Sequence, residues 1–527
     1  MKRMLRRAGP LRLVGAAERR IQGDPKAGQR LLQGRLLWRG YSVEAPGVAP
    51  WDMEVPEPCF AAEMHSFGWL PDLVSTGTSE AQALARDWTE DWLTRFGQGE
   101  GPGWAAATIG RRVLVLLYHR DVLFPWGGQG DLGRSLYGQI LWLERVWTEA
   151  EGTESRLTCL LARLLAALHV DGRQTALPQI LRDLAADMPL QEANVRNPEA
   201  WARTFFLLAW MRADLAEAGH PVPDALATAL AQMVPVLRTL RGTDGGLPRF
   251  HGGGAGPVGA LDRALALSWL RGGAAGDQAL GYHRLTHGRS TVFVDGGTQG
   301  THLSALGFEL TSGRRPIVTS CGPGERFGPD WEATTRRTAS HSALELGGIS
   351  HASEAVIRTE RRRTAGATGL NLSHDGYVTA FGLVHHRRLL LSFDGRELAG
   401  EDLLATVDRA QEQRFDAISA ELGGGVPFRV HFHLYPQISV TEHANSITLR
   451  TRGGEIWEFR AEGPVRMALE STYFLDDPAP EPVLSTQIVL SGRASDYATR
   501  LRWTLAKARQ TPDAVRDVEH TQDPVLL

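Results

Sequence analysis

Apolar residues in the first half of the chain recur at the three- and four-residue intervals of amphipathic helices. One series consists of Leu136, Ile140, Leu143 and Trp147. Two more series run through residues 201–215 and 226–240. Side chains at this spacing share one face of a helix, and short turns such as EAGHPVPDA separate the series. The pattern predicts stacked helical hairpins, with Pro235 kinking or breaking the last helix.

The pattern changes to alternation after about residue 280. Short segments rich in β-branched and aromatic residues, such as STVFVDGG, FRVHFHLYP and STQIVLSGR, are separated by glycine-containing turns. Many short alternating strands of this kind are typical of an antiparallel sandwich. Between residues 241 and 280, glycine clusters flank one short helix and mark a hinge. The sequence therefore predicts a multidomain protein, helical first and β second.

Composition excludes several function classes. The 527 residues include 57 basic and 60 acidic side chains, a net charge of -3 that gives no sign of a nucleic-acid partner. Lys2, Lys26 and Lys507 are the only lysines, so a Schiff-base or phosphate-loop lysine has almost no place in the chain. The three cysteines are far apart in sequence, which argues against a disulfide framework and against a cysteine zinc site.

The N-terminal stretch MKRMLRRAGPLRLVGAAERR is basic, but arginine and proline interrupt its apolar runs. We therefore expect no cleavable signal peptide. Apolar runs also fall short of the roughly 20 residues that a membrane-spanning helix needs. These features predict a soluble protein of the cytoplasm with no transmembrane segment.

A histidine lies within the alternating stretch TASHSALEL, residues 338–346. If this stretch is a strand, Leu344 and Leu346 face a core, and His341 and Glu345 share the opposite face. A solvated strand face explains this pair, and so does a site on that face.

Other histidines of the second half have a similar setting. His385 precedes an apolar strand, and His433 lies on the polar face of VHFHLYP. Three segments can bring His341, His385 and His433 to one surface, with Glu345 or Glu354 as a nearby carboxylate. Such nitrogen and oxygen ligands suit zinc, while structural or substrate-contacting histidines remain the alternative.

Two loops of the helical half also carry candidate residues. In EANVRNPEAW, Asn194 and Arg196 precede a helix that Asn197 can cap. In DGGLPRFHGGG, Arg249 and His251 lie on a glycine-flanked loop of the kind that often carries functional residues. A helix cap explains Asn197 but neither Asn194 nor Arg196. A surface loop without function is the alternative for the second motif.

The order of these motifs resembles the heparinase II/III-like polysaccharide lyases. The resemblance is carried by RNPEAW, DGGLPRFHGGG, GYHRLTHGRSTVFVDGG, TASHSALEL, VHFHLYP and QIVLSG, and spans about residues 30 to 505. It implies an N-terminal (α/α) toroid of helical hairpins and a C-terminal antiparallel β-sandwich. The implied boundaries are an N-terminal extension at 1–30, the toroid at 31–275, the heparinase II/III-like sandwich at 276–510 and a tail at 511–527.

Members of this family cleave acidic polysaccharides by β-elimination. The resemblance thus implies a lyase acting on a uronic-acid-containing glycan, either heparin/heparan-like or alginate-like. The carboxylate of the uronate must be neutralised before its C5 proton can be removed, and a histidine or tyrosine moves the protons. By resemblance, Asn194 and Arg196 hold the carboxylate, and His251 and His341 transfer protons.

Substrate contacts are predicted at Asn197, Arg249, Arg336 and Arg337. His385 resembles a sandwich histidine that helps to bind a structural zinc in some family members. The predicted zinc ligands are therefore His341, His385 and Glu354, and no other cofactor is expected.

The sequence departs from the family pattern at two places. Ala193 stands where related sequences usually carry a histidine, and no tyrosine lies between Tyr137 and Tyr282, where the catalytic tyrosine is usual. A non-catalytic glycan-binding protein of the same fold therefore stays open as the alternative. The partner expected in either case is an acidic polysaccharide or oligosaccharide, and a dimer is possible. The usual setting of the family, the periplasm or cell envelope, is the alternative to the cytoplasm.

Overall fold

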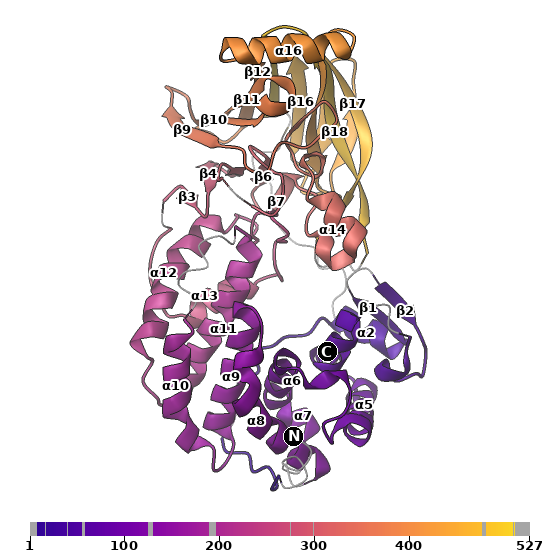
Figure 1. The fold of residues 1–527 in the computed structure, drawn as a ribbon, viewed down its shortest axis with the longest axis vertical. Coiled ribbons are helices and arrows are strands. Elements are labelled where there is room, and N and C mark those ends of the chain that lie inside the picture. The colour runs from indigo at the N-terminus through magenta and orange to yellow at the C-terminus, as the bar shows by residue number, and fades with distance from the viewer. Residues whose placement is uncertain are drawn as a thin grey trace. The chain divides into compact units, whose positions relative to one another are not determined.

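The computed structural model describes residues 8–15, 17–38, 41–54, 58–124, 130–188, 196–274, 276–298, 300–476, 481–509 and 511. Helices occupy the first half of this described chain and antiparallel sheets the second, so the predicted fold class is confirmed (Figure 1). The described residues form two compact units that do not follow chain order. The first unit draws on Met1–Glu192, Ala202–Val234 and Asp262–Arg271, and the second on Ala193–Trp201, Pro235–Leu261 and Gly272–Leu527.

The α-helices in the described residues extend over both halves of the chain. Their bounds are α2 Pro25–Leu32, α3 Pro58–His65, α4 Trp69–Ser75, α5 Ser79–Phe96, α6 Ala106–Tyr118, α7 Arg120–Leu123, α8 Asp131–Val146, α9 Thr153–His169, α10 Leu177–Ala186, α11 Pro198–Glu217, α12 Asp224–Leu240, α13 Ala260–Leu267, α14 Pro329–Thr335, α15 Val378–Phe381 and α16 Arg409–Glu421. None of these helices is long and apolar enough to cross a membrane.

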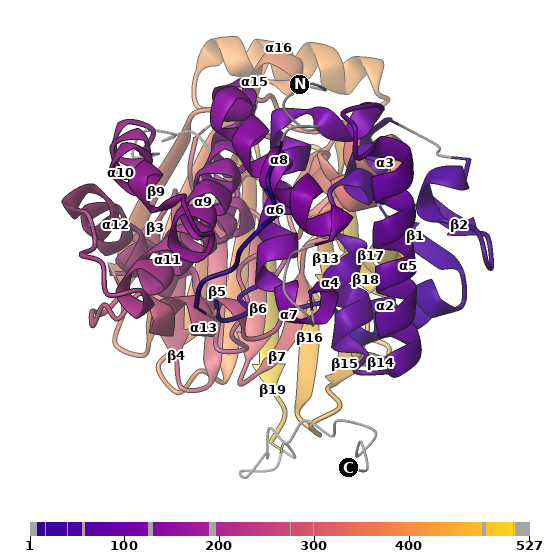
Figure 2. The same ribbon diagram turned by 90° about the horizontal axis from the view of Figure 1, so that it is seen from below.

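The helices of the first unit bury the apolar series that the spacing predicts. Leu136, Ile140 and Leu143 of α8 are at most 1% exposed, and α6, α8 and α9 lie side by side (Figures 1 and 2). The break considered at Pro235 does not occur, because α12 continues through it. Leu237, in the turn after the proline, is fully buried. Tertiary packing of this kind supplies most of the stability of a helix and outweighs one missing hydrogen bond.

Antiparallel strands make up most of the second unit. The bounds are β1 Arg35–Trp38, β2 Tyr41–Glu44, β3 Gln278–Ala279, β4 Tyr282–His287, β5 Ser290–Asp295, β6 Phe308–Ser312, β7 Arg315–Thr319, β8 Leu344–Leu346, β9 Ile357–Arg363, β10 Ala367–Tyr377, β11 Leu383–Ser392, β12 Glu397–Ala405, β13 Val426–Leu434, β14 Ser439–Glu442, β15 Ile447–Arg450, β16 Ile456–Glu462, β17 Val465–Phe474, β18 Val483–Ala494 and β19 Ala498–Lys507. The strands β1 and β2 form a separate hairpin in the first unit.

The two large sheets pack face to face as a sandwich. One has the strand order β14-β15-β16-β19-β12-β11-β10-β9 and the other β17-β18-β13-β7-β6-β5-β4-β3, with β8 paired to β13. Their inner faces meet where Trp503 of the first sheet stacks on Phe308 of the second, with ring centroids 5.3 Å apart. Phe415 of α16 also belongs to this core, and α16 lies across one end of the strands (Figure 1).

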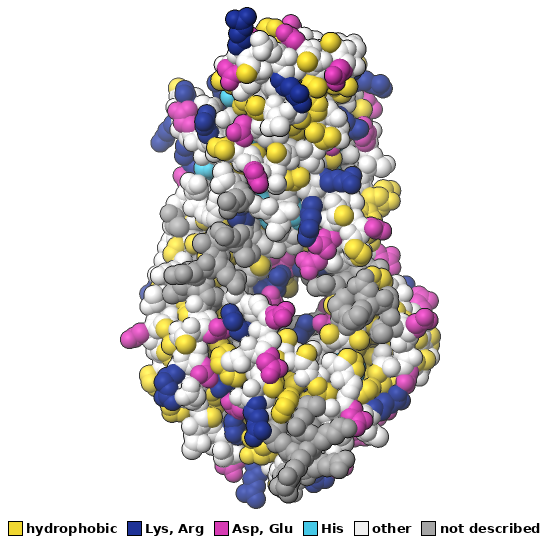
Figure 3. All heavy atoms as spheres, viewed as in Figure 1, with side chains coloured by type: hydrophobic (Ala, Val, Ile, Leu, Met, Phe, Trp, Pro, Cys, Tyr) yellow, Lys and Arg dark blue, Asp and Glu magenta, His cyan; other side chains and the backbone are white. Residues whose placement is uncertain are grey.

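Charged side chains are mixed over the visible surface. Basic and acidic groups are interspersed on the face seen in Figure 3, as expected where 57 basic and 60 acidic residues nearly balance.

A buried carboxylate on β12 organises the polar part of the sandwich core. Asp402 accepts hydrogen bonds from His385 (2.8 Å), from Nε of Arg387 (2.7 Å) and from the indole of Trp503 (3.0 Å). Although burial alone raises the pKa of Asp402, Arg387 and His385 hold it well below its usual range. His385 in turn accepts from His374 at 3.1 Å. The amide of Gly376 donates to Nδ1 of His374, so the proton of His374 is on Nε2. This fixes the donor and the acceptor in each of the hydrogen bonds that lead to Asp402.

Replacing Asp402 by asparagine will leave the fully buried guanidinium of Arg387 without its counter-charge. We expect the sandwich to lose about 3–5 kcal/mol of unfolding free energy, the usual result of breaking one partner of a buried ion pair. Urea unfolding followed by tryptophan fluorescence measures this loss. The matched control is Glu421→Gln, an exposed carboxylate at the end of α16, which we expect to change stability by less than about 0.5 kcal/mol. Equal midpoints for Asp402→Asn and wild type would contradict this account.

Candidate functional site

The loop between α12 and α13 is anchored to the sandwich by buried ion pairs. Arg249 donates to Asp476 at 2.5 Å and lies 3.7 Å from Glu309. Glu199, in the first turn of α11, accepts from the backbone of Gly254 at 2.7 Å. Arg249 is thus a structural ion-pair residue of the loop, which differs from its predicted role as a substrate contact. These bonds fix the position of the neighbouring His251.

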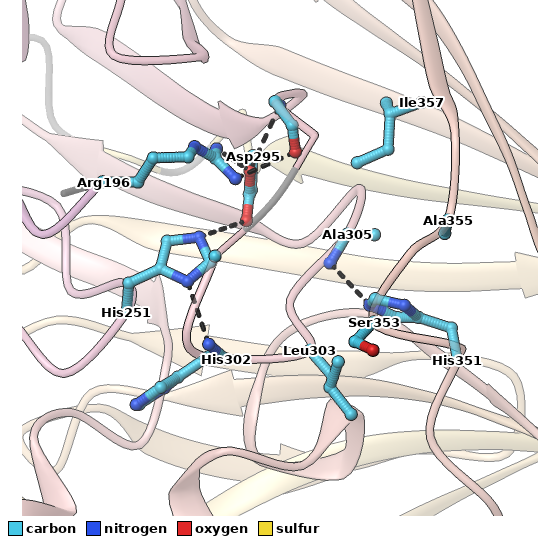
Figure 4. A pocket seen from close by; sticks show the side chains of 12 residues that line it. Arg196, His251, Asp295, His302, Leu303, Ala305, His351, Ser353, Ala355 and Ile357 are labelled. Carbon is cyan, nitrogen blue, oxygen red and sulfur yellow. Dashed lines mark hydrogen bonds and ion pairs between the residues drawn. The ribbon is translucent and has the colours of Figure 1, made fainter. Parts of the chain in front are cut away.

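His251 has a backbone conformation that few residues other than glycine adopt. Its φ is 52°, in the left-handed region. The ring is 5% exposed, and both its nitrogens are in use (Figure 4). The backbone amide of His302 donates to Nδ1 at 3.1 Å, so Nε2 carries the proton and donates it to Asp295 at 3.1 Å. Strain of this kind persists only where the surrounding structure compensates for it, and it is common at functional sites.

Asp295, at the end of β5, is the centre of this cluster. Its carboxylate also accepts from the hydroxyl of Ser304 at 2.6 Å and forms an ion pair with Arg196. Burial alone raises the pKa of this carboxyl, but Arg196 and His251 hold the pKa well below its usual range. Asp295 is therefore a buried anion that joins the segment before α11, the α12–α13 loop and the sheet.

The guanidinium of Arg196 donates hydrogen bonds to other groups of the protein. Its Nε donates to the carbonyl of Leu280 at 3.0 Å, and Nη1 donates to the carbonyl of Gly297 at 2.9 Å. The guanidinium lies 4.9 Å from the ring centre of Tyr282, whose hydroxyl donates to the Arg196 carbonyl at 2.5 Å. These contacts make Arg196 a structural clamp, whereas the sequence predicts that it holds a substrate carboxylate.

Two further imidazoles next to this cluster have nitrogen atoms without protein partners. His302 and His341 have ring centroids 5.5 Å apart, and Phe250 stacks on His341 at 6.1 Å. Among the described residues, no hydrogen-bond partner is found for either ring nitrogen of His341 or for Nδ1 of His302. Burial lowers the pKa of His302 to about 3 and that of His341 well below 6.5, with neighbouring histidines contributing. Both rings are therefore neutral near pH 7.

A small cavity opens beside these residues. Its lining includes Arg196, His251, Asp295, His302 and His351, and its volume is about 20 Å³ (Figure 4). This is room for about one water molecule. His302 lines the cavity and His341 does not, although the two ring centroids are 5.5 Å apart.

The remaining predicted site residues lie elsewhere or do other work. Asn194 lies outside the described residues. Asn197 is the predicted cap of α11, since its side chain accepts from the amide of Ala200 at 3.0 Å. Arg336 forms an ion pair with Glu332, and Arg337 is exposed. Neither arginine is among the residues that line the cavity.

The stretch TASHSALEL is only partly a strand. Thr338–Ser340 form a 3-10 turn, and only Leu344–Leu346 pair with β13, so the predicted strand through His341 is wrong. The hydroxyl of Ser342 accepts the backbone amide of His433 at 3.1 Å, which takes the place of a ladder hydrogen bond. Leu344 and Leu346 do face the core, as expected.

The predicted zinc ligands are not brought together. His385 is used by Asp402 and His374, and Glu354 is exposed. In the part of the chain that the structure describes, no group of three or more His, Cys, Asp or Glu residues is arranged to hold a metal ion. Zinc at His341, His385 and Glu354 remains a prediction that this geometry does not support.

Sequence reasoning missed Asp295 and His302, which the structure places at the centre. A signal for Asp295 exists in VDGG, where a carboxylate directly ends an apolar strand. His302 lies in the loop TQGTHLS, whose residues form no periodic pattern. Only the tertiary contact of its backbone amide with His251 identifies it.

His302 should make stability depend on pH. Its pKa falls from about 6.5 in the unfolded chain to about 3 in the folded protein, so the unfolded chain binds more protons between these values. Stability is therefore lost as the pH falls below 6.5. We expect His302→Asn to remove about 2 kcal/mol of the loss between about pH 6.5 and pH 5. Urea midpoints at the two pH values measure this, and equal losses in wild type and variant would contradict it.

The part of the chain that forms the two large sheets matches a known protein family model. Residues 271–504 match the family model described as Heparinase II/III-like, C-terminal. Among curated proteins, the chain is similar to FtsZ-localized protein C of Caulobacter vibrioides (strain NA1000 / CB15N). The two are 27% identical, over 92% of this chain and 88% of that protein.

Solved structures agree on the fold. The crystal structure of heparinase III superimposes with a TM-score of 0.66 at 11% identity, covering 94% of this chain and 86% of that one. A mutant of the heparan sulfate lyase HepC from Pedobacter heparinus gives a TM-score of 0.56 at 12% identity, covering 96% and 87%. At such identities the likeness concerns the fold. The predicted resemblance is thereby confirmed: residues 271–504 match the Heparinase II/III-like, C-terminal family model, and the chain has the fold of heparinase III.

Proposed function

We propose that this protein is a polysaccharide lyase that cleaves a uronic-acid-containing glycan, heparin/heparan-like or alginate-like, by β-elimination. The observation that carries the proposal is the pair of neutral imidazoles, His302 and His341, beside the fixed cluster of Asp295, His251 and Arg196. Neutral imidazoles accept protons, and unpartnered buried nitrogens are available to do so.

The reaction removes the C5 proton of the uronate and expels the oxygen at C4, leaving a C4–C5 double bond. In this proposal His302, whose Nδ1 has no partner among the described residues, takes the C5 proton. The proton passes through the pair of His302 and His341, whose ring centroids are 5.5 Å apart, to the C4 oxygen as its bond to C4 breaks. The low pKa of His302 applies to the protein without bound substrate. The carboxylate of a bound uronate raises that pKa, because a nearby negative charge favours the protonated ring.

The other residues have supporting roles in this proposal. His251 and Arg196 have their donors and acceptors occupied, so they position the site instead of transferring protons or holding the substrate carboxylate. Asn194 keeps the proposed role of neutralising that carboxylate. The substrate is the acidic polysaccharide or oligosaccharide that the fold family suggests.

The proposal predicts formation of unsaturated uronate, which absorbs ultraviolet light because its double bond is conjugated with the carboxylate. We expect the purified protein to raise this absorbance with at least one member of a panel of heparin, heparan sulfate and alginate oligosaccharides. His302→Ala and His341→Ala should lower the rate by about 10²–10⁴-fold, the usual contribution of a general acid or base.

His443→Ala is the matched control, because His443 is an exposed histidine of the same sandwich, and it should keep the wild-type rate. Circular dichroism of each variant checks that it is folded. A flat trace with wild-type protein on every glycan would refute the lyase proposal.

A second candidate function rests on sequence similarity. The chain is 27% identical to a protein named for its localization with FtsZ, and only 10–12% identical to the heparinase III and HepC structures. In this alternative, the protein keeps the heparinase-like fold but does not catalyse a reaction. It localises with FtsZ in the cytoplasm instead of in the cell envelope.

Sedimentation with polymerised FtsZ tests this candidate. We expect the chain to pellet with the polymers and to stay in the supernatant when FtsZ is kept unpolymerised. His302→Ala and His341→Ala should pellet like wild type, because localisation would not use proton transfer. A chain that remains in the supernatant at micromolar concentrations of both proteins argues against this function.

A further inference from the structure

The outer face of the sheet that contains β12 carries a trough. Along β12, Leu398, Gly400 and Asp402 are buried toward the core, so Ala399 and Glu401 point outward. The register aligns Leu390 with Ala399, and Ala399 with Thr504. The row then continues to Arg460 of β16. Small outward side chains in the middle of this row leave a hollow that runs across the strands.

The hollow is large enough for a small ligand. Its volume is about 350 Å³, within the range of about 300–1,000 Å³ that is usual for such sites. Leu390, Ala399 and Thr504 form its floor, together with the backbone of Gly400. The trough shares no residue with the cavity at His302.

One wall of the trough is a row of long charged side chains. The register places Arg388 opposite Glu401, Glu401 opposite Arg502, and Arg502 opposite Glu462. Nε of Arg502 donates to Glu401 at 2.8 Å. This wall therefore presents planar guanidinium and carboxylate groups, of which Arg502 and Glu401 hold each other in place.

Cationic groups flank the trough on both sides. Arg388 is exposed, donates to the amide oxygen of Asn371 at 3.2 Å, and makes no ion pair within the described residues. Arg460 is 63% exposed and pairs with Glu458. Three strand spacings separate β11, which carries Arg388, from β16, a distance of about 14 Å. The lining contains three arginines and two glutamates.

We propose that this trough binds an acidic oligosaccharide, as a second glycan site apart from the histidine cluster. The apolar floor suits the faces of sugar rings, and the charged wall suits their hydroxyl groups. Arg388 and Arg460 suit carboxylate or sulfate groups near the ends, since guanidinium matches the geometry of these anions. The direction of the trough favours a glycan over a peptide, because a peptide that extends a sheet lies along the strands at an edge.

Calorimetric titration with a size-defined heparin tetrasaccharide tests the site. The full chain carries His341→Ala throughout, so that turnover does not consume the probe and binding is measured even if the lyase proposal fails. We expect the double variant Arg388→Gln, Arg460→Gln to bind the probe about tenfold more weakly or worse, because two charge-assisted contacts are lost. Ala399→Glu, which places a negative charge in the floor without removing an arginine, should have the same effect.

Arg414→Gln is the matched control, since Arg414 is exposed on α16 and lies outside the trough. It should bind like the parent. A neutral tetrasaccharide should bind far more weakly than the heparin probe, and added salt should weaken binding of the heparin probe. Unchanged affinity in both trough variants, equal binding of the neutral probe, or no heat with the heparin probe would each overturn the proposal.

Discussion

The candidate site depends on one buried charge, the carboxylate of Asp295. It ends β5 and binds His251, Arg196 and Ser304, which come from a loop, from the segment before α11 and from the turn after β5. A buried anion is stable only when cations and donors surround it. These bonds join the three segments, all of which belong to the second compact unit, although two of them come from the helical half of the chain.

The same constraint divides the polar residues of the site into two classes. His251 and Arg196 satisfy Asp295 and backbone carbonyls, and their positions are fixed by those bonds. His302 and His341 keep nitrogen atoms that no described residue satisfies. Buried polar atoms are usually paired, so unpaired ones need a reason. A ligand or reacting group that pairs with them transiently is such a reason, and the proposed chemistry rests on it.

Asp402 plays a comparable part inside the sandwich, where it satisfies Arg387, His385 and Trp503. Here every bond joins buried groups, and none of these residues lines the cavity at His302, although Trp503 also lines the trough on the outer face of the sheet. The two carboxylates thus show how one fold uses the same interaction for stability in one place and for arrangement of a site in another. Since folds host many functions, the lyase fold alone does not decide between cleavage and localisation.

How much the sequence determines differs between the fold and the site. Periodicity alone predicted α8, α11 and α12, and the alternation after residue 280 predicted the antiparallel sheets, because burial of an apolar face is a local pattern. The sequence also singled out Arg196, His251 and His341. Tertiary structure decided what they do. It placed Asp295 and His302 among them, used Arg196 and His251 as structural contacts, and folded Thr338–Ser340 into a 3-10 turn. Hydrogen bonds between residues distant in sequence leave no periodic trace, so contacts such as those of Asp295 with Arg196 and His251 appear only once the chain is folded.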